Sequence, residues 1–291
     1  MDSAALMERV MPLHPDKLQL RIADADVLIV APRNVLDIVD RMLAHVSRVW
    51  SNERTPLRID VDFDSDIWRV RGTAPSGRKA LGRLSALPQV AGAVISSLVA
   101  ELAHHRNFNV WRAAVVEHDG QALVLIGDDW ESCVTLTAHL HTRGWRILGG
   151  DYALVSGDTM VVTAFKKVLH ANSSCVASFP MWYRRAIEAS PWYSTSAVIA
   201  FYAIDPMLVD GGSAWGDEAP LRAILKVDGS AADHPSLEAT EEFTFASGFR
   251  RNDLTRAGVE VANLVLGDFI ETSDLVEKWF GQLPAAVPIS A

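Results

Sequence analysis

One loop of this chain has the position of a phosphate-binding loop but few of its residues. The apolar run 122–126 predicts a strand that ends at Gly127, and a helical pattern follows it. In a P-loop, small residues let backbone N–H groups surround the phosphates, a lysine neutralises them, and a hydroxyl binds Mg²⁺. Aligned on that motif from Gly127, the chain has Ser132 for the second glycine, Cys133 for the lysine and Val134 for the hydroxyl residue.

The charge of this loop also opposes a nucleotide. Asp128, Asp129 and Glu131 place three carboxylates where phosphates would bring further negative charge. At ~5 Å and an effective dielectric constant of about 20, each repulsion is on the order of 3 kcal/mol. With Asp128 as N-cap and Glu131 in the first turn, the same residues would satisfy the free N–H groups of the helix. We therefore expect a self-capped helix start, with nucleotide binding at Gly127 and Thr135 as the alternative.

Cys133 is a candidate nucleophile, because a thiol in the first turn of a helix has a lowered pKa. The neighbouring carboxylates act in the opposite direction, and the motif places no histidine beside the thiol to act as a base. Cys133 and Cys175 form neither a disulfide framework nor a metal-ligand spacing. His139 and His141 face different sides of a helix, so we expect no metal site.

Composition excludes several classes of function. The chain has 291 residues, 49% of them hydrophobic, and a net charge of −9, which disfavours nucleic-acid binding. No apolar stretch reaches the ~18 to 20 uncharged residues of a membrane span. The longest candidate, 90–102, contains Glu101. The first residues have no basic segment before an apolar one, as a secretory signal would, so we expect a cytoplasmic protein.

The elements that position the loop follow from hydrophobic periodicity. Residues 1–17 predict a loosely ordered arm, and residues 18–107 predict an α+β domain. Its expected elements are strands at 18–22 and 26–30, a helix that begins near 33 and carries apolar positions up to 49, a hairpin at 57–63 and 67–70, and a helix between 88 and 105. From residue 108 the pattern changes to that of an α/β domain.

The second domain, residues 108–291, has alternating strand and helix signals. We expect strands at 122–126, 145–148, 160–162, 196–204 and 221–227, and helices at 135–140, 180–187, 253–266 and 273–282. The predicted fold class is therefore α/β, an α+β unit followed by a P-loop-like α/β domain.

Segments 111–120, 143–151 and 164–170, together with the Gly127 loop, resemble the HPr kinase/phosphorylase family. The closer resemblance is to the HPr kinase-related proteins of bacterial gene clusters, some of which modify peptides. It covers about residues 110 to 205 and implies that residues 108–291 form an HPr kinase C-terminal-like domain with a degenerate P-loop. Family members assemble, so the resemblance also allows a homo-oligomer.

The resemblance implies which residues would act, and this chain has lost most of them. In the family, a histidine on the strand before the loop, the loop lysine and an acidic pair after the next strand surround the phosphoryl group. Here those positions hold Arg112, Cys133 and Gly150, and only Asp151 of the acidic pair remains. Without these residues, no side chain remains to position the phosphoryl group and neutralise its charge. The resemblance therefore indicates a pseudo-kinase with a vestigial site at Arg112, Cys133 and Asp151.

Arg112 has two interpretations. It could be a relocated phosphate-binding cation, since its position should point at the same site. It could instead pair with Asp129, Glu131 or Asp151 and neutralise a partly buried acidic cluster. We favour the ion pair.

Two further segments are candidates for binding a partner. Lys166, Lys167 and His170 form a basic patch; in the family this segment lies close to the phosphoryl-transfer centre, and a solvated strand edge is the alternative. Trp182 and Tyr183 are aromatic residues of the kind that anchors partners, or they belong to the core.

The first hypothesis is a non-catalytic HPr kinase-like pseudo-kinase that binds a peptide or protein partner and needs no cofactor. It would be an accessory or scaffold in a bacterial biosynthetic or regulatory system. The alternative is a divergent Mg·ATP-dependent kinase acting on a peptide or small molecule, with Arg112, Lys166 or Lys167 replacing the loop lysine. A third, weaker hypothesis is sensing of an unphosphorylated metabolite in the same pocket.

Overall fold

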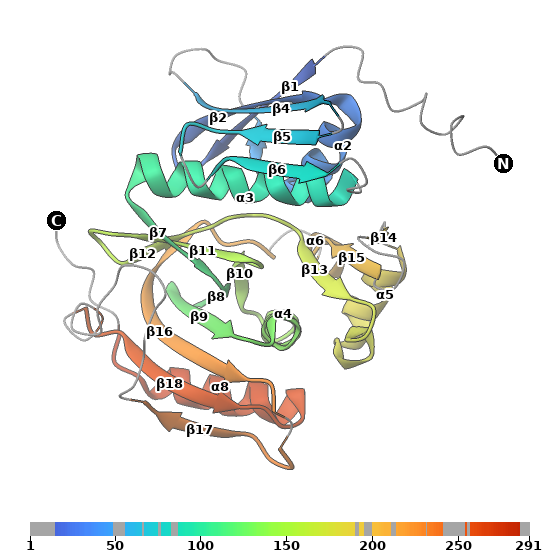
Figure 1. The fold of residues 1–291 in the computed structure, drawn as a ribbon. Helices are drawn as coiled ribbons and strands as arrows, with labels where there is room; N and C mark the ends of the chain where they lie inside the picture. Colours follow the sequence, from blue (N-terminus) through green and yellow to red (C-terminus); the bar gives the residue numbers. More distant parts are fainter. Residues whose placement is uncertain are drawn as a thin grey trace. The chain divides into compact units, whose positions relative to one another are not determined.

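The chain divides into two compact units, Met1–Arg106 and Asn107–Ala291, in a computed structural model (Figure 1). The structure describes residues 15–48, 56–65, 67–74, 77–82, 87–189, 192–194, 200–210, 214–230, 232–240, 254 and 257–285. Most of the predicted arm, residues 1–14, lies outside the described residues.

The first unit is a six-stranded sheet with two helices. Its order is β3-β1-β2-β4-β5-β6. The strands are β1 (Pro15–Ile22), β2 (Ala25–Pro32), β3 (Ser47–Arg48), β4 (Leu57–Asp64), β5 (Ile67–Arg71) and β6 (Lys79–Gly82). Helices α2 (Arg33–Met42) and α3 (Leu87–Arg106) pack on each other and on the strands. The predicted hairpin is confirmed as β4–β5, and the predicted strands β1 and β2 also pair with each other, antiparallel.

Helix α2 is shorter than its apolar pattern predicts. It ends at Met42, and the chain turns to pair Ser47 and Arg48 with β1. The guanidinium of Arg48 donates to the carbonyls of Leu43 and Val46, at 3.2 and 3.0 Å. These bonds satisfy carbonyls that a longer helix would have used, so Leu43 and Val46 lie in the turn after the helix, and position 49 lies outside the described residues.

Residues Leu87–His105 of α3 have the length and composition of a membrane span, but half of that window is buried inside the protein. Its buried positions, Val90, Val94, Leu98 and Leu102 among them, match the predicted core face of a globular helix. The core helix of a globular protein can have the same length and hydropathy as a membrane helix, so these two properties are weak evidence for a membrane span.

The second unit contains a nine-stranded sheet, a three-stranded sheet and their helices. The main sheet has the order β10-β8-β9-β16-β12-β11-β7, and β18 pairs with β16 and β17; the small sheet has the order β13-β15-β14. The strands are β7 (Phe108–Arg112), β8 (Ala114–His118), β9 (Gln121–Gly127), β10 (Arg146–Gly149), β11 (Tyr152–Ser156), β12 (Val161–Thr163), β13 (Leu169–Asn172), β14 (Trp192–Ser194), β15 (Ala200–Ile204), β16 (Glu218–Asp228), β17 (Ser236–Ala239) and β18 (Glu260–Val265). The helices are α4 (Trp130–His141), η3 (Val176–Ser178), α5 (Met181–Ala189), α6 (Met207–Asp210) and α8 (Phe269–Gln282).

The predicted strand–loop–helix–strand segment is confirmed as β9, α4 and β10. Side chains of β9 alternate between two cores: Ala122 and Val124 belong to one, and Leu123 and Leu125 to the other. The second core includes buried residues of α4 and α8, which contact each other. The mixed α/β class is thus observed.

Two predictions for this unit need correction or limits. The predicted helix 253–266 is wrong over Glu260–Val265, which form β18, a parallel neighbour of β16. Residues 253, 255 and 256 lie outside the described residues, as do 196–199 of the predicted strand 196–204. Helix α8 begins at Phe269, four residues before the predicted start, because Asp268 caps it by accepting bonds from the amides of Ile270 and Glu271.

Candidate functional site

The start of α4 is capped by Asp129, not by Asp128 as predicted. The Asp129 carboxylate accepts bonds from the amides of Glu131 at 3.2 Å and Ser132 at 3.5 Å, and from the Ser132 hydroxyl. Its side chain also packs against Gly229 after β16, where an added Cβ would lie 2.7 Å from the carboxylate. Asp128 is exposed. The close fit against β16 decides which of the two neighbouring aspartates is the cap.

This cap occupies the amides that a phosphate would use. In a P-loop, the first-turn N–H groups of the helix point at the bound anion. Here a carboxylate of the chain itself takes those of Glu131 and Ser132. Gly127 also has a role that needs no ligand, because a Cβ there would lie 2.5 Å from the carbonyl oxygen of Val227 on β16.

The side chains of Cys133 and Thr135 are not open to solvent. Both side chains are buried, and Cys133 belongs to the core between the sheet, α4 and α8. Burial, and then the charge of Asp129, raises the pKa of the Cys133 thiol to about 12. The thiol is therefore protonated at neutral pH, which removes the condition for a nucleophile.

The structure brings together three residues that the sequence placed in two groups. Asp151 follows β10, and its carbonyl oxygen accepts a bond from the Ala113 amide at 3.2 Å. The Lys167 ammonium contacts the Asp151 carboxylate, with 3% and 17% of the two side chains exposed. The Nζ of Lys167 lies 3.4 Å from Nδ1 of His170. Asp151, Lys167 and His170 thus form one polar cluster, in which Lys167 is buried and the other two side chains are partly buried.

Burial controls the protonation of this cluster. It lowers the pKa of Lys167 to about 7, although the contacting Asp151 carboxylate favours the ammonium. Burial, and then the charge of Lys167, holds the pKa of His170 well below its usual value, so this imidazole is neutral. Its Nε2 is buried and has no hydrogen-bond partner in the described part of the chain.

The other residues of the predicted patch and acidic pair lie apart from this cluster. Lys166 donates to Asp217 at 2.5 Å, on the exposed side of the segment. At Gly150, where the resemblance predicts the first acid of the pair, an added Cβ would lie 2.5 Å from Cδ2 of Leu169. An aspartate at this position would therefore require the Leu169 side chain to shift.

Arg112 does not pair with the acidic residues as expected. Among the described residues it forms no ion pair within 4.0 Å, and its guanidinium lies 5.6 Å from the ring centroid of Trp130. The three acids have other partners: Asp151 contacts Lys167, Asp129 caps α4, and Glu131 accepts a bond from the Ser174 hydroxyl at 3.3 Å. Arg112 is an exposed cation beside the capped loop.

The two aromatic candidates have different environments. Tyr183 is fully buried, and its hydroxyl lies 2.6 Å from Nδ1 of His141. It belongs to the core. Trp182 is 55% exposed, and the Arg185 guanidinium lies 4.9 Å from its ring centroid. Only Trp182 is available to a partner.

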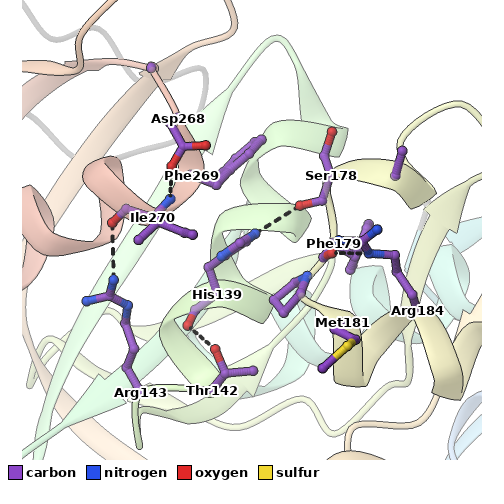
Figure 2. A pocket seen from close by; sticks show the side chains of 13 residues that line it. His139, Thr142, Arg143, Ser178, Phe179, Met181, Arg184, Asp268, Phe269 and Ile270 are labelled. Atoms are coloured by element: carbon purple, nitrogen blue, oxygen red, sulfur yellow. Dashed lines mark hydrogen bonds between the residues drawn. The ribbon is translucent and has the colours of Figure 1, made fainter.

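Sequence reasoning missed a groove of about 670 Å³ in the second unit. It is lined by residues from 139–143 at the end of α4, 177–184 before and within α5, and 267–270 at the start of α8 (Figure 2). We call it the α5–α8 groove. Its three segments are far apart in the sequence and share no motif, although the predicted helix 180–187 contributes to one of them.

Metal ligands do not gather elsewhere in what the structure describes: within those residues, no three His, Cys, Asp or Glu side chains are arranged to hold an ion. The described residues of the second unit thus form buried polar contacts and a groove.

No family model matches the chain, and no curated protein matches it. Among solved structures, the chain is similar to the HPr(Ser) kinase/phosphatase from Coxiella burnetii, with 13% identity and a TM-score of 0.31 over 59% of this chain and 97% of that chain. A similarity this distant concerns the fold alone. It carries nothing about the loop after Gly127 or about an activity.

Proposed function

We propose that this chain is a non-catalytic HPr kinase-like protein that binds a peptide or protein partner as an accessory or scaffold. The observation that carries the proposal is the Asp129 cap. A carboxylate on the first-turn amides of α4 excludes a phosphate from the same place by both contact and charge.

The positions and partners of the lysines near the loop support the same proposal. The position of the loop lysine holds a buried thiol, Lys166 pairs with Asp217, and Lys167 is enclosed with Asp151. None of these groups is free to neutralise a transferred phosphoryl group, which is a large part of phosphoryl-transfer catalysis.

A divergent ATP-dependent kinase is the second candidate, and Arg112 is the observation that favours it. This cation is exposed beside the loop and has no ion-pair partner among the described residues. A kinase of this kind would have to bind phosphate through Arg112 without the helix amides.

Calorimetric titration of Mg·ATP and Mg·ADP into the purified full chain separates the two candidates. We expect no binding up to millimolar nucleotide. An Asp129→Gly variant, which frees the α4 amides, should gain weak binding, while the matched Asp128→Gly variant should gain less. Micromolar binding by the unaltered chain, lost in Arg112→Ala, would support the kinase.

A further inference from the structure

We propose that the α5–α8 groove binds an acidic peptide segment of the partner through one large apolar side chain and one carboxylate. This inference rests on the partner-binding function proposed above and assigns its site and the chemistry of its ligand. The apolar side chain would lie between Met181 and Ile270, and the carboxylate would pair with Arg184.

The groove concentrates exposed apolar surface. Five large hydrophobic side chains are exposed among the described residues, and two of them, Met181 at 55% and Ile270 at 59%, line this groove. They come from different elements, α5 and α8, and the neighbouring Phe269 also lines the groove (Figure 2). Apolar side chains exposed around a concave surface mark binding sites more often than isolated ones do. A volume of about 670 Å³ is in the range of ligand pockets.

The walls of the groove are held in place without a ligand. The rings of His139 and Phe269 stack at 5.3 Å, and Nε2 of His139 lies 2.9 Å from the carbonyl oxygen of Ser178. Arg143 donates to the carbonyl of Ile270 at 3.1 Å. These contacts join α4, η3 and α8, so a peptide would meet a preformed surface and lose less ordering entropy on binding.

Most charges of the lining are already balanced. Arg143 pairs with Asp274 at 2.5 Å and Glu277 at 2.8 Å. The Asp268 carboxylate accepts the first amides of α8. Burial lowers the pKa of His139, despite the opposing contact with Ser178, so its ring is neutral at pH 7.

Arg184 is the cation of the lining that has no acidic partner among the described residues. Its Nε donates to the carbonyl of Phe179 at 2.8 Å, which fixes the side chain at the rim. Within the described ranges, no ion pair engages its guanidinium. On a chain with a net charge of −9, an arginine without an ion pair beside the exposed side chains of Met181 and Ile270 favours a carboxylate from the partner.

The test is selection of a phage-displayed library of random 12-residue peptides on the full chain. The enriched peptide is then synthesised with a fluorescein label and its affinity is measured by anisotropy. Groove variants are Arg184→Glu and Met181→Asp. Their matched controls outside the lining are Arg185→Glu and Leu208→Asp, and thermal unfolding confirms that all four variants fold.

We expect enrichment of peptides with an acidic and a large apolar residue. Arg184→Glu and Met181→Asp should each weaken binding about tenfold or more, while the two controls should change it by less than about threefold. A peptide with its acid replaced by lysine should regain affinity for Arg184→Glu. That rescue would show direct pairing and not a loss of folding.

Three outcomes would overturn the inference. A library without this enrichment would remove the proposed ligand chemistry. If the groove variants bind the peptide as tightly as the unaltered chain does, the peptide site lies elsewhere, and the proposed partner-binding function is unaffected. A concentration-dependent dimer that Arg184→Glu dissociates would make a second copy of the chain the occupant. Micromolar Mg·ATP binding, by contrast, would overturn the non-catalytic proposal without bearing on the groove.

Discussion

The ammonium of Lys167 contacts the carboxylate of Asp151 beside the end of β10, and little of either side chain is exposed. A buried ion pair contributes little net stability, because the desolvation of its two charges offsets their attraction. Removing one partner is nevertheless strongly destabilising, because it leaves an uncompensated buried charge. We expect Asp151→Ala to lower the free energy of unfolding by about 3 kcal/mol. The double variant Lys167→Met/Asp151→Leu should recover most of that loss. Urea denaturation measures both, and an Asp151→Ala variant as stable as the unaltered chain would contradict the role of the pair.

The same lysine predicts a dependence of stability on pH. The pKa of Lys167 is lowered from its usual 10.5 to about 7 in the folded chain, so between these values the unfolded state binds more protons. Stability should therefore rise with pH from about 7 to about 10 and be independent of this group below 7. At about 1.4 kcal/mol per pKa unit, the rise is a few kcal/mol at most.

The Lys167→Met variant is the reference for this measurement, since other groups also titrate in that range. The difference in free energy of unfolding between the unaltered chain and Lys167→Met isolates the contribution of the lysine. A difference that stays flat from pH 7 to 10 would mean that Asp151 keeps the ammonium charged in the folded chain.

The α4 cap predicts different effects for two adjacent aspartates. Asp129→Ala removes the acceptor for the Glu131 and Ser132 amides, and should lower the free energy of unfolding by ~1 kcal/mol. Asp128→Ala changes an exposed side chain and should remain within about 0.5 kcal/mol of the unaltered chain. Equal losses in urea denaturation would assign the cap to both residues.

The sequence predicted the local elements of the second unit better than their contacts. Period-two and helical patterns located β9, α4, β10, α5 and most of α8. Residues 260–265 were predicted as helix because a short apolar run fits either period, and the neighbouring strand β16 decides in favour of a strand. The cap was misplaced by one residue because Asp128 and Asp129 have the same intrinsic capping preference.

The candidate site could be predicted only in part, because tertiary contacts arrange it. Lys166 and Lys167 look equivalent in sequence, but consecutive side chains leave the backbone in different directions, one to Asp217 and one to Asp151. The β-bridge between Gly149 and Phe165 brings the Lys167 segment beside Asp151. This long-range contact cannot be deduced from the spacing of residues in the sequence. The α5–α8 groove needs three distant segments, so no local pattern could have indicated it.

The two thiols should resist alkylation in the folded chain. Burial, and then a nearby carboxylate, raises the pKa of Cys133 to about 12 and of Cys175 to about 11, from a usual value of 9.0. At pH 8 this reduces the thiolate fraction of Cys175 about a hundredfold and that of Cys133 about a thousandfold. Mass spectrometry after iodoacetamide treatment should find both unmodified in native protein and modified in urea. A Cys175→Ser variant isolates Cys133, and rapid native labelling of that variant at pH 8 would restore Cys133 as a candidate nucleophile.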